Sequence, residues 1–281
     1  MLSVSQLFIY PIKSLGGIPV QHAMITDRGF QYDRRWMLVD RNNCFLTQRD
    51  LPEMALLQVE LISDGLKIYH KEKTHLQITI PSYPKLFETA EVEIWEEKCQ
   101  VQFVSKEADE WFTKMLSFNC RLVYMPDTTI LPVDKRYATH NEITSLSDGY
   151  PFLLIGQSSL DELNARLSDS LSINRFRPNI IFSGGAPYEE DCLEYFTINN
   201  IDFYGVKLCA RCMITTINQE NIQRSKEPLK TLATYRTRNN KIYFGQNLLH
   251  HGTGKISIGD ALEVVKFNAI NALYFAEPKS I

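Results

Sequence analysis

Short segments in which apolar and polar residues alternate dominate the first hundred residues of the chain. A period of two is typical of a β-strand that buries one of its faces. Turn-forming pairs such as Gly16-Gly17 and Asp64-Gly65 separate these segments. We therefore expect strands in VSQLFIY, IPVQHAMI, RWMLVD, ALLQVELI, LKIYH, HLQITI, EVEIW and CQVQFV.

The helical period first appears in the segment 106–118, KEADEWFTKMLSF, whose apolar residues fall on one face. We expect this face to lie in the core. A second helix is expected over 158–168, with a serine N-cap and an acidic first turn. A short third helix is expected to begin at Pro228, because proline is favoured in the first turn of a helix.

Strand patterns return after residue 178. The polar segment 126–147 shows neither period and is expected to be a linker or a flexible loop. The pattern predicts a β-rich α+β protein with a β-barrel-like domain at 1–125 and a second β-barrel domain at 126–281, against which the first strands are able to pack. The later strands are expected in NIIFSG, YFTINNIDFYGVKLC, MITTIN, KIYFGQNLL and KISIGDALEVVKF.

Composition narrows the range of partners. The 281 residues carry a formal net charge of −3, which disfavours a broad basic surface for nucleic acid but allows a local basic pocket. No run of apolar residues approaches the roughly 20 needed to cross a bilayer, and the N-terminus lacks the pattern of a signal peptide. We therefore expect a soluble, cytoplasmic protein that binds neither nucleic acid nor a membrane.

The six cysteines are expected to be reduced, and two of them form the motif Cys209-Ala210-Arg211-Cys212. The motif fits half of a zinc site, which His250 and His251 would have to complete. It also fits two buried cysteines, or a redox dithiol, although such a dithiol opens a helix and MITTIN is strand-like. Finally, one of the two cysteines could bind a redox-active metal as a single thiolate, which Arg211 would favour. The motif by itself leaves these alternatives open.

Cationic residues stand beside several predicted strands. Lys13-Ser14 follows the first strand and suits phosphate binding, although a solvated turn is the simpler explanation. Arg34 and Arg35 open another strand, where neighbouring side chains point to opposite faces, so one of them would face inward and need an anion or a carboxylate. Arg177 precedes an apolar strand. Cations and a thiolate together suit a phosphorylated, metal-bearing cofactor.

These segments resemble, in order, those of the MOSC family, the C-terminal domains of molybdenum cofactor sulfurases together with the β-barrel domain that precedes them. The resemblance covers nearly the whole chain and is closest to bacterial and mitochondrial proteins that reduce amidoximes and N-hydroxylated bases. The matching segments are YPIKS at 10–14, DRRW at 33–36, LTQRDLP at 46–52, SDGYPFLL at 147–154, SLDELNARL at 159–167, FRPNI at 176–180, CARCMITTI at 209–217, KEPLKTLATYR at 226–236, FGQN at 244–247 and GKISIGD at 254–260.

The resemblance implies a molybdenum cofactor whose metal is bound by the second cysteine of the motif, Cys212. It also implies that Lys13 and Ser14 hold the phosphate and the pterin. Asp148 is implied as a catalytic residue for proton transfer, although it could equally cap the turn before Pro151. The cofactor-binding residues implied in this way are Lys13, Ser14, Arg34, Asp148, Gly149, Tyr150, Arg177, Asn179, Ala210, Arg211, Cys212 and Asn247.

Three departures from the family pattern lie near this site. The mitochondrial relatives carry Thr-Ser where this chain has Gly149-Tyr150, and tyrosine where it has Asn247. The family's tight turn Asp-Pro-x-Thr-Gly is replaced by Asn-Gln-Glu-Asn-Ile at 218–222. The resemblance therefore does not predict the shape of this loop or of the substrate entrance.

The function implied by the resemblance is the two-electron reduction of small N-hydroxylated compounds, such as hydroxylaminopurines and amidoximes, in a detoxifying role. Some bacterial relatives continue into a ferredoxin domain, but no cysteine cluster appears here before Ile281. We therefore expect a separate electron donor of the ferredoxin or flavodoxin type.

Two other functions compete with this expectation. One is a carrier of the cofactor or of sulfur, in which Cys212 would bear a persulfide. The other is a structural or nucleic-acid-binding β protein, which would leave the inward cations unexplained.

Overall fold

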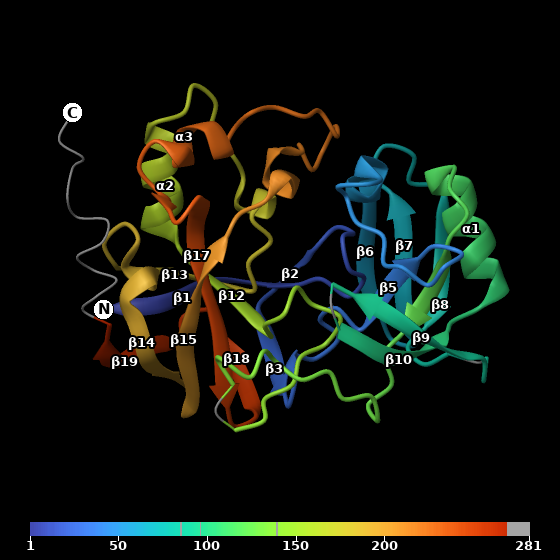
Figure 1. Ribbon diagram of the computed structural model, residues 1–281, viewed down its shortest axis with the longest axis horizontal. Coiled ribbons are helices and arrows are strands. Elements are labelled where there is room, and N and C mark those ends of the chain that lie inside the picture. The colour runs from blue at the N-terminus through green and yellow to red at the C-terminus, as the bar shows by residue number, and fades with distance from the viewer. Residues whose placement is uncertain (85, 96, 139, 269–281) are drawn as a thin grey trace.

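The computed structural model describes residues 1–84, 86–95, 97–138 and 140–268, and strands dominate this part of the chain (Figure 1). The strands are β1 (Leu2–Ile9), β2 (Ile18–Val20), β3 (His22–Thr26), β4 (Gly29–Phe30), β5 (Trp36–Val39), β6 (Leu57–Ile62), β7 (Gly65–His70), β8 (Gln77–Pro81), β9 (Thr89–Ile94), β10 (Glu97–Phe103), β11 (Arg121–Tyr124), β12 (Phe152–Gly156), β13 (Ile180–Ser183), β14 (Leu193–Ile198), β15 (Ile201–Ala210), β16 (Thr237–Arg238), β17 (Lys241–His251), β18 (Gly254–Ser257) and β19 (Ala261–Phe267). The helices are α1 (Lys106–Leu116), α2 (Gln157–Ala165) and α3 (Leu229–Ala233), joined by 3₁₀ turns at Pro52–Leu56, Ile173–Arg175, Glu189–Cys192 and Met213–Thr216.

Seven strands close into a barrel. They follow the order β12-β13-β1-β19-β14-β15-β17, and β17 pairs back onto β12. Strand β1 lies antiparallel to β13, although most of the chain separates them in sequence. The barrel interior is filled by aromatic and aliphatic side chains, among them Phe152, Phe196 and Phe203. The β-rich α+β class predicted from the sequence is confirmed.

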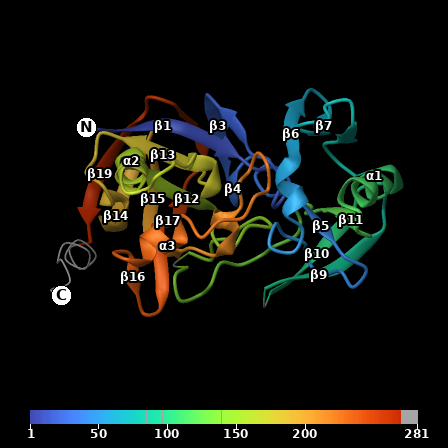
Figure 2. The same ribbon diagram turned by 90° about the horizontal axis from the view of Figure 1, so that it is seen from above.

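A second body lies beside the barrel, at the right of Figure 1 and also separate from the barrel in Figure 2. It combines a four-stranded sheet, β5-β11-β10-β9, with a three-stranded sheet, β6-β7-β8, and α1. Successive side chains of β5 point to opposite faces. Trp36 and Leu38 pack toward α1 and the three-stranded sheet, and Met37 and Val39 pack into a separate cluster on the other face.

The segment 126–147 contains no helix and no named strand in its described residues. It nevertheless packs closely, because Leu131 and Leu146 are buried in the cluster that covers the four-stranded sheet. The segment covers this sheet, and its role as a linker or flexible loop stays a prediction. The domain boundary near residue 125 stays a prediction, since β1 pairs with strands from the second half of the chain.

The predicted helices are present, although α3 begins at Leu229, with the expected first residue Pro228 as its N-cap, and the start of α2 was predicted wrongly. Helix α1 begins after Ser105, whose hydroxyl accepts the N–H of Ala108 as an N-cap. Helix α2 begins after Gly156, with no side-chain cap and no acid in its first turn, so the predicted serine cap and acidic turn are wrong. The two serines of this turn are engaged elsewhere, because Ser158 donates to the Gly185 carbonyl and Ser159 to the Glu190 carboxylate.

The prediction of a strand over MITTIN is wrong. Met213–Thr216 forms a 3₁₀ turn that begins directly after Cys212. The hydroxyls of Thr215 and Thr216 donate to the carbonyls of Cys212 and Met213, three residues back, and so stabilise the turn in place of a strand. The sequence argued against a redox dithiol because no helix was expected after the motif. That objection does not hold, because a 3₁₀ turn directly follows Cys212. None of the helices in the described ranges is long and apolar enough to cross a membrane.

Candidate functional site

The residues singled out in the sequence converge on one cavity of about 320 Å³. Of the twelve expected cofactor-binding residues, eleven line it, from Lys13 near the N-terminus to Asn247 in β17. The exception is Gly149, which lies between two lining residues and has φ of +106°, a conformation that favours glycine. Because the barrel and the second body both contribute residues, no single stretch of sequence defines the site.

The cavity is strongly cationic, although the chain as a whole is acidic. Among the described residues, its walls contain six arginines and lysines but a single carboxylate, Asp148. The folded chain therefore gathers positive charge at one place while its formal net charge is −3, an arrangement that favours an anionic ligand. The six cations are Lys13, Arg34, Arg49, Arg177, Lys207 and Arg211.

Lys13 and Asp148 form an ion pair at the cavity wall. The Lys13 ammonium donates to Asp148 Oδ1 at 2.7 Å and to the Leu146 carbonyl at 2.9 Å. Burial lowers the pKa of Lys13, and Asp148 partly offsets this. Desolvation among the cavity walls raises the pKa of Asp148. The charge of Lys13 and its hydrogen bond lower this pKa by more, so that it lies well below its usual range. Asp148 is therefore ionised at neutral pH in this arrangement.

Asp148 does not cap the turn before Pro151. Its carboxylate also accepts from the indole N–H of Trp95, at 3.4 Å. The turn is held by Ser147, whose hydroxyl donates to the Tyr150 carbonyl at 2.8 Å. The Asp148 side chain is thus left facing the cavity, where it contacts Lys13.

Arg34 faces inward and Arg35 turns away, as expected for neighbouring side chains, but Arg34 lies in a turn rather than in a strand. Its φ of +48° is left-handed, and β5 begins two residues later. The Arg34 guanidinium pairs with the buried carboxylate of Asp33 and donates to Asn179 Oδ1 at 2.9 Å. Arg35 bonds instead to the Met125 carbonyl. The inward arginine therefore already has a carboxylate partner.

Asn179 is a junction between strands. Its side-chain oxygen accepts from Arg34 and from the backbone N–H of Leu153, and its amide donates to the Phe8 carbonyl. Only 1% of Asn179 is exposed. Its contacts indicate that it positions Arg34 and the strands β1 and β12 around the cavity.

Arg177 has hydrogen-bonding capacity to spare. Its guanidinium stacks 4.3 Å from the centre of the Tyr10 ring, and Nη1 donates to the Leu15 carbonyl at 2.6 Å. Within the described part of the chain, Nη2 is buried without a hydrogen-bond partner. Burial lowers the pKa of Arg177 to about 10. A buried, unpartnered N–H is costly, so an anion in the cavity would stabilise this arrangement.

The two cysteines of the CxxC motif differ in environment. Cys212 is exposed in the cavity, whereas Cys209 is half-buried and accepts a hydrogen bond from Arg211 Nη1 at 3.0 Å. Arg211 also donates to the Phe176 carbonyl at 2.7 Å, and its buried Nε has no partner among the described residues. All six cysteines are free thiols.

The described residues offer no ligand set for a structural zinc. No three side chains of histidine, cysteine, aspartate or glutamate gather as metal ligands in the ranges that the structure covers. His250 is buried against Phe152 and bonds to the Thr26 carbonyl, and neither it nor His251 lines the cavity. Of the alternatives for the motif, a single exposed thiol at Cys212 fits the geometry best.

Arg49, Trp95 and Lys207 also line the cavity and were not singled out from the sequence as site residues. Arg49 stacks 4.5 Å from the centre of the Trp95 ring, and Lys207 lies 4.8 Å from the centre of the Tyr137 ring. Arg49 falls in the segment LTQRDLP, which resembles the family, so a signal was available. Trp95 and Lys207 had none, because each looks like an ordinary residue of a hairpin or of an exposed strand face.

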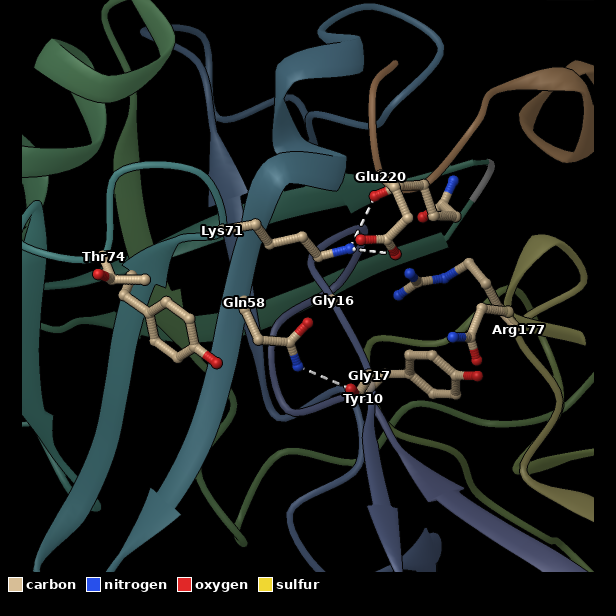
Figure 3. Close-up of a pocket in the computed structure, with 11 residues that line it drawn as sticks. Tyr10, Gly16, Gly17, Gln58, Lys71, Thr74, Arg177 and Glu220 are labelled. Carbon is tan, nitrogen blue, oxygen red and sulfur yellow. Dashed lines mark hydrogen bonds and ion pairs between the residues drawn. The ribbon is translucent and has the colours of Figure 1, made fainter. Parts of the chain in front are cut away.

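A second, larger cavity of about 410 Å³ shares Arg177 with the first (Figure 3). It lies between β6, β7 and the loop 218–222, and its charges are mixed. Lys71 donates to Glu220 at 2.9 Å and to the Gln219 carbonyl at 2.7 Å, as the dashed lines in Figure 3 show. These bonds hold the loop whose shape the family pattern did not predict.

The first cavity fits an anionic cofactor that carries a metal. An exposed thiol lines the same space as the guanidinium groups of Arg177 and Arg211, each of which has an N–H without a partner among residues 1–84, 86–95, 97–138 and 140–268. Thiolate is a soft ligand for a redox-active metal, and arginine is suited to phosphate. The larger cavity has no cysteine in its lining. The smaller, cationic cavity is therefore the candidate functional site.

Comparison with known proteins gives two domain matches. Residues 1–119 match the model of the MOSC N-terminal beta barrel domain, and residues 141–263 match that of the MOSC domain. Mitochondrial amidoxime-reducing component 1 of Mus musculus is 32% identical to the chain, over 92% of this chain and 81% of the relative. Its counterpart in Homo sapiens is 30% identical to the chain, over 92% of this chain and 81% of that relative.

A second group of relatives carries another name. The molybdenum cofactor sulfurase of Solanum lycopersicum is 29% identical over 90% of this chain. The chain spans only 34% of that relative's length.

Proposed function

The chain belongs to the MOSC family, and from this premise we propose that it binds a molybdenum cofactor in the cationic cavity and reduces N-hydroxylated compounds. The observation that carries the proposal is the exposed thiol of Cys212 in a cavity with six cations and one carboxylate. The names of the amidoxime-reducing relatives support the reductive activity.

In this proposal Cys212 is the protein ligand of the metal. Lys13, Ser14 and Arg177 hold the cofactor's phosphate, and the unpartnered Arg177 Nη2 supports this role. Arg34 and Asn179 fix the wall behind them through their mutual hydrogen bond. The remaining contacts to the pterin come from Tyr150, Ala210, Arg211 and Asn247, and Gly149 allows the turn between Asp148 and Tyr150.

The reaction converts R–NHOH, two electrons and two protons into R–NH₂ and water. The bound cofactor supplies the two electrons. The protein orients the substrate and provides a proton for the oxygen that leaves as water. Asp148 can hold such a proton only when Lys13 is engaged elsewhere, because the Lys13 ammonium keeps the pKa of Asp148 low. Phosphate binding by Lys13 would therefore favour proton uptake at Asp148.

The electrons come, in this proposal, from a separate donor protein of the ferredoxin or flavodoxin type. The names of the amidoxime-reducing relatives support a reductase that needs such a donor. The cytoplasmic location stays a prediction. A second candidate function is a cofactor or sulfur carrier, which the match to a molybdenum cofactor sulfurase favours. In that case Cys212 would carry sulfur without turnover.

One experiment separates the two functions. Protein with one molybdenum per chain is supplied with reduced viologen and with acetamidoxime or 6-hydroxylaminopurine, and the product, acetamidine or adenine, is measured. We expect turnover, and we expect none with a Cys212→Ser variant. Full molybdenum occupancy without any turnover would contradict the reductase and favour the carrier.

A further inference from the structure

Two cations of the cavity, Arg49 and Lys207, have no role in holding the cofactor as proposed above. Arg49 is the more informative. It is only partly exposed, and in the part of the chain that the structure describes it forms no ion pair. Its Nε donates to the Thr47 hydroxyl at 3.2 Å. A partly buried guanidinium without a carboxylate partner is free to bind an anion that enters the cavity.

Trp95 stands directly beside Arg49. It occupies the turn between β9 and β10 in a left-handed conformation with φ of +59°. The Phe45 ring centre lies 5.2 Å from it, the Arg49 guanidinium lies 4.5 Å from its ring centre, and the indole N–H points to Asp148. Trp95 is nevertheless 47% exposed while it lines the cavity. Phe45, Arg49 and Asp148 thus hold a large, rigid aromatic surface open to a ligand.

We propose that Arg49 and Trp95 form the recognition site for the substrate, and that this substrate is an N-hydroxylated nucleotide rather than a free base. Trp95 offers a surface on which a planar base stacks, and Arg49 offers a charge for the nucleotide phosphate. The inference deepens the proposed function and rests on it. It assigns the two residues to substrate and not to cofactor.

The pairing of the two residues selects this class of substrate. A small aliphatic amidoxime presents neither an extended ring nor a negative charge, so it would gain little from either side chain. A free hydroxylaminopurine would use Trp95 alone. Only a nucleotide uses both, and the excess of positive charge over the single carboxylate of the cavity favours such an anion.

Binding tests the inference without turnover. Cofactor-loaded protein is titrated in a calorimeter with adenosine 5′-monophosphate, the amino form of one such nucleotide, and with adenosine. We expect the wild type to bind the nucleotide about tenfold more tightly than the nucleoside. Arg49→Ala should weaken nucleotide binding about tenfold and leave adenosine nearly unchanged. Trp95→Leu should weaken the binding of both ligands. Trp95→Phe, which keeps an aromatic ring, should bind both ligands nearly as tightly as the wild type.

Matched variants exclude general effects of charge and surface. Arg41→Ala removes an exposed arginine of the same loop region, and Phe87→Leu removes an aromatic ring that is 95% exposed. Neither residue lines the cavity. We expect both variants to bind the two ligands as the wild type does.

Turnover provides the second measurement. With reduced viologen, the wild type should show its lowest KM for the 5′-monophosphate of 6-hydroxylaminopurine riboside, a higher KM for the free base, and the highest for acetamidoxime. Arg49→Ala should raise the KM for the 5′-monophosphate and leave the other two KM values unchanged. Equal binding of nucleotide and nucleoside by the wild type would overturn the inference, and so would a loss of molybdenum in Arg49→Ala, because that residue would then hold the cofactor. If nothing is reduced but the binding pattern holds, the reductase proposal fails and the nucleotide site stands.

Discussion

At the scale of single residues, Arg177 offers the clearest test of how the cofactor is held. Its guanidinium stacks on Tyr10 and bonds to one carbonyl, while Nη2 remains without a partner among the described residues. We predict that Arg177→Ala lowers molybdenum content severalfold, because it removes a charge-assisted contact of about 1.5–3 kcal/mol. The melting temperature of the cofactor-free protein should change little.

The control for Arg177 is Arg136→Ala, because Arg136 lies at the surface and pairs with Asp134. Metal analysis and thermal unfolding of the cofactor-free protein are measured together. Collapse of the cofactor-free fold in Arg177→Ala, with unchanged cofactor affinity in the molecules that remain folded, would show that Arg177 is a structural residue.

Glu190 gives a prediction for pH dependence. Its side chain is fully buried beside Asp191 and accepts from Ser159. Burial first, and the neighbouring carboxylate second, raise the pKa of Glu190 well above its ordinary value. An acid with a raised pKa favours folding while it is protonated. Its contribution to the free energy of unfolding is therefore greatest below the ordinary glutamate pKa and falls as the pH rises toward the raised value.

Glu190→Gln should consequently stabilise the protein at pH 8 and have less effect at pH 5. The expected gain is about 1–3 kcal/mol, since one pKa unit corresponds to about 1.4 kcal/mol. The free energy of unfolding is measured in urea at both pH values, with the exposed Glu110→Gln as the control. A variant less stable at pH 8 than the wild type would contradict the assignment.

The sequence identified most cavity residues because they stand in ordered motifs, and Cys212 and Arg177 do lie in the same space. Their chemical roles stay predictions. Trp95 escaped notice because its importance comes from the placement of a hairpin next to Asp148, far away in sequence. No local pattern encodes such a contact.

At the scale of elements, the loop 218–222 connects the two bodies. The side-chain amides of Gln48 and Gln219 exchange two hydrogen bonds, of 3.1 and 2.8 Å, and both residues are buried. The ion pair between Lys71 and Glu220 is more exposed, since the Glu220 side chain is 70% accessible. The buried amide pair should therefore contribute more to stability than the ion pair.

We predict that Gln219→Ala lowers the free energy of unfolding by about 1–3 kcal/mol, because it leaves the buried Gln48 amide without this partner. Glu220→Ala should cost less than about 1 kcal/mol. Denaturation in urea measures both, and a double-mutant cycle with Gln48→Ala isolates the coupling. Equal decreases in the free energy of unfolding for Gln219→Ala and Glu220→Ala would show that the buried amide pair contributes no more to stability than the ion pair.

Elements with a strong local period were predicted well, and α1 is the best example, with Ala108, Phe112 and Leu116 buried on one face. The failure at Met213–Thr216 has a physical cause. The β-branched residues of this segment favour a strand, but the threonine hydroxyls bond to backbone carbonyls three residues back and stabilise a turn instead.

At the scale of the whole molecule, closure of the barrel pairs the first strand with strands from the second half of the chain. Strand β1 fills the position between β13 and β19. The fragment 126–281 would lack this strand and expose two strand edges and part of the core. We predict that the fragment alone shows no cooperative thermal unfolding, whereas a fusion of 1–31 to it does. Circular dichroism measures both, and a cooperative transition in the fragment alone would contradict this account.

The sequence predicted a β-rich protein with barrels, and the structure confirms that class. The order of the strands could not be read from alternation, because a period of two specifies a buried face but not a neighbour. The pairing of β17 with both β12 and β15 closes the barrel, and it depends on contacts between distant segments.

In the proposed holoenzyme, Cys212 alone among the cysteines binds the metal of the molybdenum cofactor. X-ray absorption at the molybdenum edge measures this binding most directly, on cofactor-loaded wild type, Cys212→Ser and Cys209→Ser. We predict that Cys212→Ser loses one molybdenum–sulfur contact relative to the wild type, while Cys209→Ser keeps the full number. An unchanged number of sulfur ligands in Cys212→Ser would contradict the account.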